Sequence, residues 1–447
     1  MTTRIVVIGM GYVGIPAAAL LADVDGYDVI GLQRRSKRSG WKIDVLNSGK
    51  SPFEGDEPGL DELIAKVVEK GTFRVTDDID ILKDADIILI DVQTPTDAQN
   101  MPQYVSLREV SKNIGQRMKK GAMVVVESTV APGTTQNVVQ KILEKESGLK
   151  GGEDFDLAFS YERVMPGKLL EFIVNMPRVV GGITPKSTER ALEMYSKIIK
   201  EKIYTTDTLS AELAKTIENA YRDVNIAFAN EMALVCESLG VNIYEIIELI
   251  NARHDRHMHI PGAGVGGHCL PKDPWLLRFG LYEYGSWKIE PEFISVARRI
   301  NNHMPVHLSN LVENALLARG VSVHDAKIVV LGVAYLENAD DTRNTPAVPL
   351  IGSLQTKGAT LVLHDPYVHQ WEFTQHEIER DLYDCAKDAD CLVLVTKHKE
   401  YFDADLEKLK SIMRTPIIVD GRNVWDQKSV EKAGFEYRAV GKSGIKR

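Results

Sequence analysis

A single cysteine stands in a glycine-rich stretch, and a lysine and an aspartate follow it closely. The stretch covers residues 264–273 and reads GVGGHCLPKD. A thiolate is the nucleophilic form of cysteine, and partial exposure and a nearby cation such as Lys272 favour it. The glycines would let a substrate approach the backbone closely. These residue types predict a covalent active site at Cys269; the alternative is a buried, inert thiol in a turn.

A second chemical signature lies near the start of the sequence. The run RIVVI at 4–8 predicts a buried strand, the next six residues read GMGYVG, and residues 17–22 favour a helix. Glycines in this position permit a tight turn that brings a pyrophosphate to the N-terminus of the helix, where backbone N–H groups and the helix dipole favour anions. The sequence therefore predicts a dinucleotide site rather than a structural turn. Its expected residues are Gly9, Gly11, Tyr12, Val13 and Gly14.

The residue expected to select the dinucleotide is not acidic. A carboxylate at the end of the second predicted strand, 27–33, would bind the ribose hydroxyls of NAD. This chain has Gln33, followed by Arg34, Arg35 and Ser36. The change leaves room for the 2′-phosphate of NADP, and a solvated basic turn is the alternative.

One long segment without proline, 208–239, predicts a single helix ended by Gly240. Lys215, Asn219 and Arg222 are spaced i, i+4, i+7 and share one face of it. A solvated polar face is the usual explanation of such spacing, but apolar residues at 226, 228, 232 and 234 predict that the helix is largely buried. A buried Lys-Asn pair could donate hydrogen bonds to an oxyanion.

Further polar residues follow predicted strands, where doubly wound sheets place their chemistry. Thr129 comes after the strand at 123–127, and Glu162 lies in the segment SYERVMPGK at 160–168. Residues 251–256, NARHDR, add cationic groups shortly before Cys269, although by themselves they would be surface residues.

The order of predicted elements indicates an α/β fold. Strands at 4–8, 27–33, 87–92 and 123–127 alternate with helices, and a second strand-helix pattern starts at 327–332 and recurs at 360–364, 391–395 and 417–420. We therefore expect two Rossmann-like doubly wound domains joined by a long central helix and a helical middle domain. The predicted boundaries are 1–205, 206–318 and 319–447.

Composition excludes several classes of protein. The 447 residues include 63 acidic and 54 basic side chains, and the net charge of −9 disfavours binding to nucleic acid or to anionic membranes. No apolar run is long enough to span a bilayer, and no signal peptide is recognisable. The four cysteines have neither a disulfide framework nor a zinc spacing, so we expect a cytoplasmic protein without a metal site.

Five of these motifs, in this order, resemble the UDP-glucose/GDP-mannose dehydrogenase family over nearly the whole chain. They are the glycines at 9–14, ESTVAPG at 127–133, Lys215-x-x-x-Asn219-Ala220, the cysteine loop, and Asp341-Thr342-Arg343. Within the family, the segments 162–168, 219–225, 254–256 and 261–269 are most similar to the branch that acts on UDP-N-acetylhexosamines.

The resemblance implies a four-electron oxidation of carbon 6 of a UDP-sugar, with two NAD molecules and a thioester on Cys269. It implies that Lys215 and Asn219 stabilise the oxyanion, that Asp273 positions or activates water, and that Thr129 and Glu162 assist hydride transfer and hydrolysis. UDP-N-acetyl-D-mannosamine is the favoured substrate. UDP-glucose, UDP-N-acetylglucosamine and UDP-N-acetylgalactosamine are alternatives, and a non-catalytic nucleotide-sugar binding protein is the alternative from another class.

The resemblance also implies the binding residues and a homodimer or higher homo-oligomer, formed through the central helix. NAD contacts would come from the N-terminal domain, with NADP tolerated, and the C-terminal domain would bind the nucleotide of the substrate. The expected cofactor contacts are Gly9, Gly11, Tyr12, Val13, Gly14, Gln33, Arg34, Thr94, Thr129, Lys272 and Arg343. The expected substrate contacts are Arg163, Val164, Lys215, Asn219, Arg222, His254, Arg256, Gly266, Tyr335 and Leu336.

One departure from the family pattern concerns the substrate. The family commonly has Phe-Lys after the first strand of the C-terminal domain, whereas this chain has Tyr335 and Leu336. The aromatic ring is kept and the ammonium is lost. Either another cation replaces it, with Lys272 and Arg343 available, or the substrate differs.

Overall fold

The computed structural model describes residues 2–37, 39–53, 55, 57–369, 371 and 377–442. These residues form two compact units. The first unit contains residues 1–218 and 272–290, and the second contains 219–271 and 291–447. Each contains one sheet, with both faces covered by helices, as the near-continuous apolar strands predict.

The sheet of the first unit has eight strands among the described residues, in the order β3-β2-β1-β4-β5-β6-β7-β8. They are β1 Thr3–Ile8, β2 Tyr27–Leu32, β3 Phe73–Thr76, β4 Ile87–Ile90, β5 Met123–Val126, β6 Asp156–Phe159, β7 Arg178–Gly182 and β8 Ile203–Asp207. The strand order reverses between β1 and β4, and a crevice that binds dinucleotides is expected at such a switch point.

The helices of the first unit connect these strands and cover both faces of the sheet. They are α1 Gly14–Asp23, α2 Trp41–Asn47, α3 Leu60–Glu69, η1 Ile79–Asp84, α4 Val105–Gly115, η2 Thr135–Gln140, α5 Lys141–Ser147, α6 Leu169–Asn175, α7 Pro185–Tyr195 and α10 Asp273–Tyr284. Side chains of β1 alternate between two cores: Ile5 and Val7 pack on one face, and Val6 and Ile8 on the other.

This sheet is not parallel throughout. β7 pairs with β6 in the antiparallel direction, through Ala158 with Gly182 and Phe159 with Gly181, and β8 is parallel to β7. The expectation of a parallel sheet holds for β1 to β6. The chain enters β7 from α6 and runs back along β6, so β7 and β8 extend the sheet beyond the doubly wound part.

The second unit repeats the architecture with six described strands, all parallel, in the order β11-β10-β9-β12-β13-β14. They are β9 Lys327–Leu331, β10 Thr360–His364, β11 Ile378–Glu379, β12 Cys391–Leu394, β13 Ile417–Asp420 and β14 Glu436–Ala439. Its helices are α9 Ile243–Asn251, α11 Glu292–Ala318, η3 Val323–Asp325, α12 Ala347–Thr356, α13 Leu382–Ala386, η4 Lys399–Tyr401, α14 Leu406–Ile412 and α15 Gln427–Lys432.

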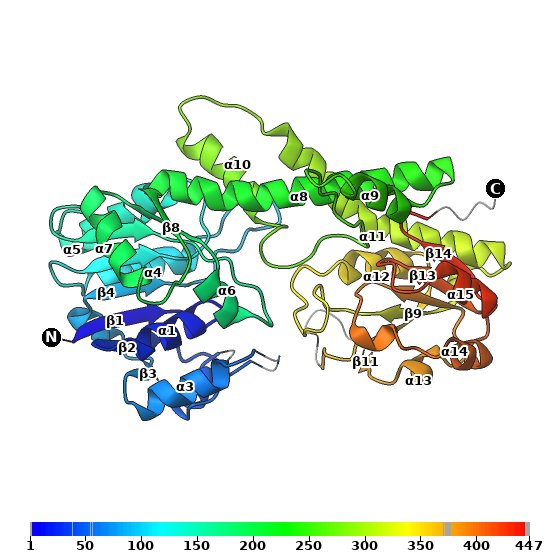
Figure 1. Cartoon of the computed structure of the whole chain (residues 1–447), viewed down its shortest axis with the longest axis horizontal. Coiled ribbons are helices and arrows are strands. Elements are labelled where there is room, and N and C mark those ends of the chain that lie inside the picture. Colours follow the sequence, from blue (N-terminus) through cyan, green and yellow to red (C-terminus); the bar gives the residue numbers. More distant parts are fainter. Residues whose placement is uncertain are drawn as a thin grey trace. The chain divides into compact units, whose positions relative to one another are not determined.

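Helix α8, Thr208–Leu239, begins in the first unit and ends in the second, and Figure 1 shows it in green as one unbroken helix. Its bounds are those predicted from the absence of proline. It ends where Gly240 adopts a φ of 77°, a left-handed conformation that glycine adopts without strain. The structure thus combines two Rossmann-like sheets with a helical central region.

Candidate functional site

The glycine loop after β1 has the geometry that a dinucleotide requires. A Cβ on Gly9 would lie 2.4 Å from the carbonyl oxygen of Asp91, and one on Gly14 would lie 2.0 Å from that of Gly9. At Gly11, by contrast, nothing lies within 4 Å of the place where a Cβ would be. Two glycines are therefore required for packing, and the third leaves the backbone open to a ligand. Helix α1 begins at Gly14.

The side chain of Gln33, after β2, holds this loop in place. Its Oε1 accepts a hydrogen bond from Met10 N at 3.1 Å, and its Nε2 donates to Ser39 Oγ at 3.0 Å. Arg34 is exposed, with a long ion pair of 3.8 Å to Glu109. A neutral amide and an exposed guanidinium thus occupy the position where an NAD-specific carboxylate was expected.

Aromatic rings flank the same loop. The rings of Tyr12 and Phe53 are stacked, with centroids 4.4 Å apart, and Lys42 Nζ lies 5.8 Å from the centroid of Phe53. Lys42 also donates to Met10 O at 3.1 Å. Phe53 and Lys42 were not expected from the sequence, because no motif links them to the glycine loop.

Four expected residues of the first unit meet at the carboxyl edge of its sheet. Thr94 Oγ1 donates to Thr129 O at 2.6 Å, and Lys272 Nζ donates to Thr94 Oγ1 at 3.3 Å. Lys272 also forms an ion pair of 3.0 Å with Asp273, the first residue of α10, and both side chains are buried. An acidic residue in the first turn is favourable to the helix dipole. A buried ammonium and carboxylate therefore lie beside two threonines.

Lys215 and Glu162 form a second pair of expected residues in this unit. Lys215 Nζ donates to the backbone oxygen of Glu162 at 2.7 Å and lies 3.8 Å from its carboxylate. It also lies 5.2 Å from the ring centroid of Tyr161. Glu162 Oε2 accepts from Val164 N at 2.5 Å, which fixes the carboxylate beside the ammonium. Such a charged pair can donate and accept protons during an oxidation.

Arg163 is held by a residue that the sequence did not single out. Its guanidinium bonds Glu218 at 2.8 to 3.1 Å and Tyr161 Oη at 2.9 Å. Burial acts to raise the pKa of Glu218, but the neighbouring Arg163 lowers it overall. Glu218 lies three residues after Lys215 on α8, and that helical spacing is the signal that could have identified it.

The three expected residues on α8 differ in exposure. Lys215 is buried, Asn219 is half-buried one turn later, and Arg222 is exposed. The prediction that α8 is largely buried is wrong over part of the helix, because the side chain of Phe228 is 54% exposed and that of Tyr221 is 70% exposed. Both apolar side chains face solvent in the single chain.

In the second unit, the glycine-rich loop before Cys269 packs closely against residues after β9. A Cβ on Gly266 would lie 2.5 Å from Tyr335 Cβ, and one on Gly267 would lie 2.7 Å from the Tyr335 ring. Gly267 N donates to Arg343 O at 2.9 Å, and Asn344 Nδ2 donates to Gly267 O at 3.0 Å. Tyr335 thus supports the loop, which explains why an aromatic residue fits there.

Cys269 is the exposed thiol of the chain. Cys236, Cys385 and Cys391 are buried, and none of the four cysteines forms a disulfide. Burial raises the pKa of the Cys385 thiol to about 12 and also raises that of Cys391. The three buried thiols are therefore unsuited to nucleophilic chemistry, and Cys269 is accessible to a substrate.

Four further expected residues lie on the second unit's surface or beside this loop. Arg343 forms a bidentate ion pair with Asp341, at 2.9 and 2.5 Å. His254 and Arg256 are exposed, and Arg256 pairs with Asp255 at 2.9 Å. Leu336 is half-buried. The structure brings Arg343 to the loop through its backbone and leaves His254 and Arg256 facing solvent.

The sequence did not identify Arg422, which supports the same loop. Its Nη2 donates to Gly264 O at 3.2 Å, and its Nε donates to Val395 O at 2.8 Å. Arg422 follows strand β13 at the carboxyl edge of the sheet, and this placement is the signal that could have found it.

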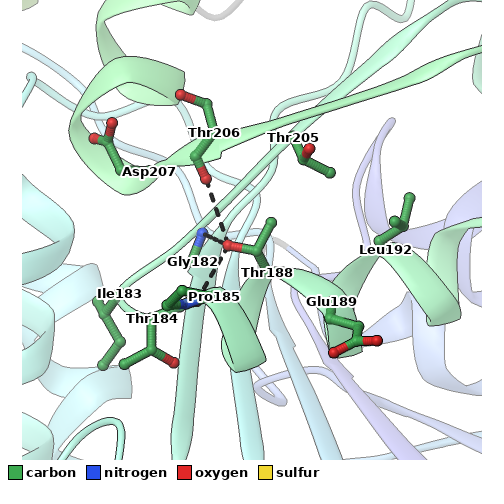
Figure 2. Close-up of a pocket in the computed structure, with 10 residues that line it drawn as sticks. All are labelled: Gly182, Ile183, Thr184, Pro185, Thr188, Glu189, Leu192, Thr205, Thr206 and Asp207. Carbon is green, nitrogen blue, oxygen red and sulfur yellow. Dashed lines mark hydrogen bonds between the residues drawn. The ribbon is translucent and has the colours of Figure 1, made fainter.

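A surface hollow of about 510 Å³ lies elsewhere in the first unit and contains none of the expected residues. It is lined by Gly182, Ile183, Thr184, Pro185, Thr188, Glu189, Leu192, Thr205, Thr206 and Asp207. Figure 2 shows the Thr188 hydroxyl at its centre, where it accepts from Gly182 N at 2.9 Å and contacts Thr206 O at 3.4 Å. These bonds tie α7 to β7 and β8, so the hollow has a structural explanation.

The described residues contain neither a membrane-spanning helix nor a metal-binding cluster. No helix among them is long and apolar enough to cross a membrane. Within the same residues, no three His, Cys, Asp or Glu side chains are grouped in a way that could hold a metal ion.

Comparison with protein families gives three consecutive matches. All are to the UDP-glucose/GDP-mannose dehydrogenase family: its NAD binding domain matches residues 3–199, its central domain matches 209–303, and its UDP binding domain matches 329–427. The glycine loop lies in the first range and the cysteine loop in the second.

Individual relatives match over almost their whole length. A UDP-N-acetyl-D-mannosamine dehydrogenase of Pyrococcus horikoshii is 38% identical over 99% of this chain and 100% of its own. Its solved structure superposes with a TM-score of 0.91. The crystal structure of an NDP-N-acetyl-D-galactosaminuronic acid dehydrogenase from Methanosarcina mazei Go1 is 40% identical, covers 99% of this chain and 96% of its own, and has a TM-score of 0.89.

Proposed function

The chain belongs to the UDP-glucose/GDP-mannose dehydrogenase family and is an NAD-dependent UDP-sugar dehydrogenase, and from this premise we propose that it oxidises carbon 6 of a UDP-N-acetylhexosamine to the carboxylate through a thioester on Cys269. One observation carries the proposal: Cys269 is the accessible thiol, at the end of a loop fixed by Tyr335, Arg343 and Asn344. A fixed backbone beside an exposed nucleophile supports covalent catalysis.

The residues present fit the dinucleotide. We assign it to Gly9, Gly11, Tyr12, Val13, Gly14, Gln33, Arg34, Thr94, Thr129, Lys272 and Arg343. The open face of Gly11 and the start of α1 would receive its pyrophosphate. When bound, NAD would accept one hydride from the sugar in each of the two oxidations, so two NAD molecules would be reduced per sugar.

The first oxidation removes a hydride and a proton from the alcohol at carbon 6. Glu162, held by Lys215 and by Val164 N, accepts protons, and Thr129 positions the reacting group. The Cys269 thiolate then adds to the aldehyde carbon, and Lys215 and Asn219 donate hydrogen bonds to the resulting oxyanion. Loss of a second hydride leaves a thioester. Water positioned by Asp273 opens the thioester, which releases the acid and the thiolate.

We propose that ten residues bind the sugar nucleotide. They are Arg163, Val164, Lys215, Asn219, Arg222, His254, Arg256, Gly266, Tyr335 and Leu336. UDP-N-acetyl-D-mannosamine is the substrate we favour, because relatives that cover the whole chain are named for it. UDP-N-acetylgalactosamine is an alternative substrate, because an NDP-N-acetyl-D-galactosaminuronic acid dehydrogenase is also similar to this chain. Leu336, where the family commonly has lysine, also bears on the choice of sugar, since discrimination of one hydroxyl depends on local contacts.

We also propose a homodimer or higher homo-oligomer in the cytoplasm. Its functional segments are NAD binding at 1–205, a central segment with the cysteine loop at 206–318, and UDP-sugar binding at 319–447. Cysteines without disulfides suit a reducing compartment, and exposed apolar side chains on α8 support association.

The decisive experiment counts NADH formed per sugar consumed, with a panel of UDP-sugars that includes UDP-glucose. We expect two NADH per sugar and a carboxylate product, without free aldehyde. Cys269→Ala should lose acid production, whereas the control Cys236→Ala, which removes a buried thiol, should keep the ratio of two. Cys269→Ser should accumulate a slowly hydrolysed ester, visible by mass spectrometry of the Cys269 peptide, because an alkoxide is a poorer leaving group than a thiolate.

Four outcomes would contradict the proposal in different ways. One NADH per sugar would remove the second oxidation. Unimpaired acid production by Cys269→Ala would remove the thioester. Tight binding of a UDP-sugar without any NADH would favour the non-catalytic binding protein, and turnover of UDP-glucose alone would change the substrate but not the chemistry.

A further inference from the structure

Two carboxyl side chains occupy neighbouring positions at the carboxyl edge of the first sheet. Asp91 follows β4 and Glu127 follows β5, directly after the paired residues Ile90 and Val126. Glu127 N donates to Ile90 O at 3.1 Å, so the register continues past the strand ends. Asp91 N donates to Ile8 O at 2.8 Å, which ties the same place to β1. Asp91 therefore lies at the switch point between β1 and β4, where dinucleotides bind, and Glu127 lies one strand further along the same edge.

The hydrogen bonds of the two carboxyls are incomplete. Glu127 Oε1 accepts from the Arg178 guanidinium and from Tyr195 Oη at 2.7 Å. Glu127 Oε2 and Asp91 Oδ2 are both buried without a hydrogen-bond donor among the described residues. Because Asp91 and Glu127 directly follow the paired residues Ile90 and Val126, the continued register makes their side chains neighbours on one face of the sheet. One proton held between them would give both oxygens a partner, as buried polar atoms require.

The charge balance leads to the same conclusion. The titratable and charged groups that face Asp91 are Glu127 after β5, Arg178 on β7, Glu162 after β6, and, across Glu127, Tyr195 on α7. Arg178 supplies one positive charge against two buried carboxyls, and Glu162 adds a negative field. Burial first, and the neighbouring Glu127 second, raise the pKa of Asp91 well above its usual range. Burial and the mutual repulsion of neighbouring carboxylates both disfavour a negative charge on Asp91.

The pair contacts the dinucleotide loop through Asp91. A Cβ on Gly9 would lie 2.4 Å from Asp91 O, and one on Gly14 would lie 3.4 Å from Asp91 Cβ. Next to Glu127, the hydroxyl of Ser128 donates to Val92 O at 2.7 Å, so the two strand ends are coupled. A repulsion between the carboxyls would therefore displace the backbone on which Gly9 and Gly14 rest.

We propose that Asp91 and Glu127 share one proton and act as positioning residues for the dinucleotide loop, and that loss of this proton to solvent at alkaline pH leaves two adjacent carboxylates that weaken dinucleotide binding. The step is a simple ionisation, in which hydroxide takes the proton and becomes water. Neither residue touches the reacting atoms in this proposal.

The first test uses the apoprotein and does not depend on turnover. A carboxyl whose pKa is raised by folding contributes stability below its unfolded pKa, near 4, and loses that contribution as the pH rises through the folded value. Asp91→Asn imitates the protonated carboxyl and cannot ionise. We expect the melting temperature of the wild type to fall at alkaline pH relative to that of Asp91→Asn.

The matched control is Asp86→Asn, at the other end of β4. Asp86 forms an ion pair with Lys119 at 2.6 Å and accepts from Arg4 N at 2.8 Å. Burial opposes these contacts, but they lower the pKa of Asp86 overall, which is the opposite direction. Asp86→Asn should therefore lose stability at neutral pH and keep the alkaline decline of the wild type.

The second test measures the dissociation constant of NADH by its fluorescence, at neutral and alkaline pH. The wild type should bind about tenfold or more weakly at the alkaline end, a change of about 1.4 kcal/mol, whereas Asp91→Asn should bind almost equally at both. Parallel stability profiles for wild type and Asp91→Asn would overturn the shared proton. The positioning role would be overturned by another result: the stability of Asp91→Asn no longer declines at alkaline pH, but its binding of NADH keeps the pH dependence of the wild type.

Infrared spectroscopy gives a measurement on the wild type, in case Asp91→Asn does not fold. A protonated carboxylic acid has a carbonyl stretch that is distinct from carboxylate bands. Such a band should be present in the wild type at neutral pH and should weaken as the pH rises, because the shared proton is lost to solvent. Its absence from the wild type would contradict the proposal, and loss of UDP-sugar turnover alone would not affect it.

Discussion

At the scale of single residues, Gln33 has a role that its position in the sequence did not indicate. The residue was expected at the ribose of the cofactor. In the structure both polar atoms of its amide form hydrogen bonds within the protein: Oε1 accepts from Met10 N, and Nε2 donates to Ser39 Oγ. It therefore shapes the glycine loop and the following turn together. A carboxylate at 33 would keep the acceptor and lose the donor.

We predict that Gln33→Glu sharpens the choice between the two dinucleotides. The new carboxylate would still accept from Met10 N, but it would also repel the 2′-phosphate of NADP and accept from the ribose hydroxyls of NAD. The ratio of kcat/KM for NADP to that for NAD should fall about tenfold or more. The assay compares both cofactors at fixed UDP-sugar concentration.

Gln99→Glu is the matched control, because it adds the same charge on an exposed glutamine of the same unit. Its cofactor ratio should equal that of the wild type. If Gln33→Glu also left the ratio unchanged, the 2′-phosphate would have to be recognised or excluded by residues other than those after β2.

The sequence indicated candidate residues for the site but not the contacts between them. The glycines, Lys215 and Cys269 are identified by type and local spacing. The bond between Lys272 and Thr94 joins residues 178 positions apart, and no local pattern encodes such a pairing. The same holds for Arg422 and the cysteine loop, because long-range contacts follow from how strands are ordered in a sheet.

At the scale of elements, α8 is attached to the segment after β5 by one buried carboxylate. Glu212 Oε2 accepts from Gly133 N at 2.6 Å, and its Oε1 accepts from Thr135 N at 2.7 Å. Glu212 precedes Lys215 by three residues on the same helix. Because Thr129 begins the segment that Glu212 holds, this carboxylate couples two parts of the candidate site.

We predict that the Glu212 carboxyl makes stability depend on pH near neutrality. Burial raises its pKa to about 7, although the N–H groups it accepts from act to lower the pKa. Because the folded value exceeds the unfolded one, its contribution is present below about pH 4 and is lost as the pH rises through about 7. The free energy of unfolding should decline by on the order of 3 kcal/mol from this group.

Urea unfolding of wild type and Glu212→Gln across that pH range checks the prediction. The variant should be less stable at low pH, since glutamine offers one acceptor instead of two, but its pH dependence should be flatter. The exposed Glu193→Gln should retain the wild-type profile. Identical slopes in wild type and Glu212→Gln would show that Glu212 does not titrate there.

The positions of helices and strands along the chain were largely predictable, whereas the directions in which neighbouring strands pair were less so. The helix Thr208–Leu239 has the predicted bounds because proline is absent and Gly240 ends it. The antiparallel pairing of β6 with β7 was not predicted, since an apolar strand pattern is the same in both directions. Strands β2, β4 and β5 end one or two residues before their predicted ends. The residues just beyond, Gln33, Asp91 and Glu127, have polar contacts instead of extending the strands.

At the scale of the whole molecule, the three predicted segments correspond to two compact units. The cause is the packing of residues 219–271, because Ala229 and Ala233 on α8 and Ile243 and Ile247 on α9 join the core of the C-terminal sheet. The sequence shows a change from strands to helices near 206, but not which sheet a helix will cover. A prediction of three functional segments is therefore compatible with a structure that has two compact units.

Helix α8 carries an apolar stripe that the single chain leaves exposed. Its members in the second unit are Tyr221, Phe228, Val235 and Leu239, at 70, 54, 42 and 61% exposure. Spacings of seven and four residues place them on one side of the helix. Exposed apolar patches of this kind mark interaction surfaces, which supports the proposed homo-oligomer.

We predict that Phe228→Asp dissociates the oligomer. A carboxylate buried in an apolar interface lacks a partner, and losing an aromatic contact there costs at least about 2 kcal/mol, or roughly thirtyfold in the dissociation constant. Sedimentation velocity over a range of concentrations should show the wild type as a dimer or larger, and the variant shifted to monomer. Phe402→Asp is the matched control, because Phe402 is 53% exposed but lies outside the stripe, and it should sediment like the wild type. A monomeric wild type, or a Phe228→Asp variant that stays associated, would assign the stripe another role.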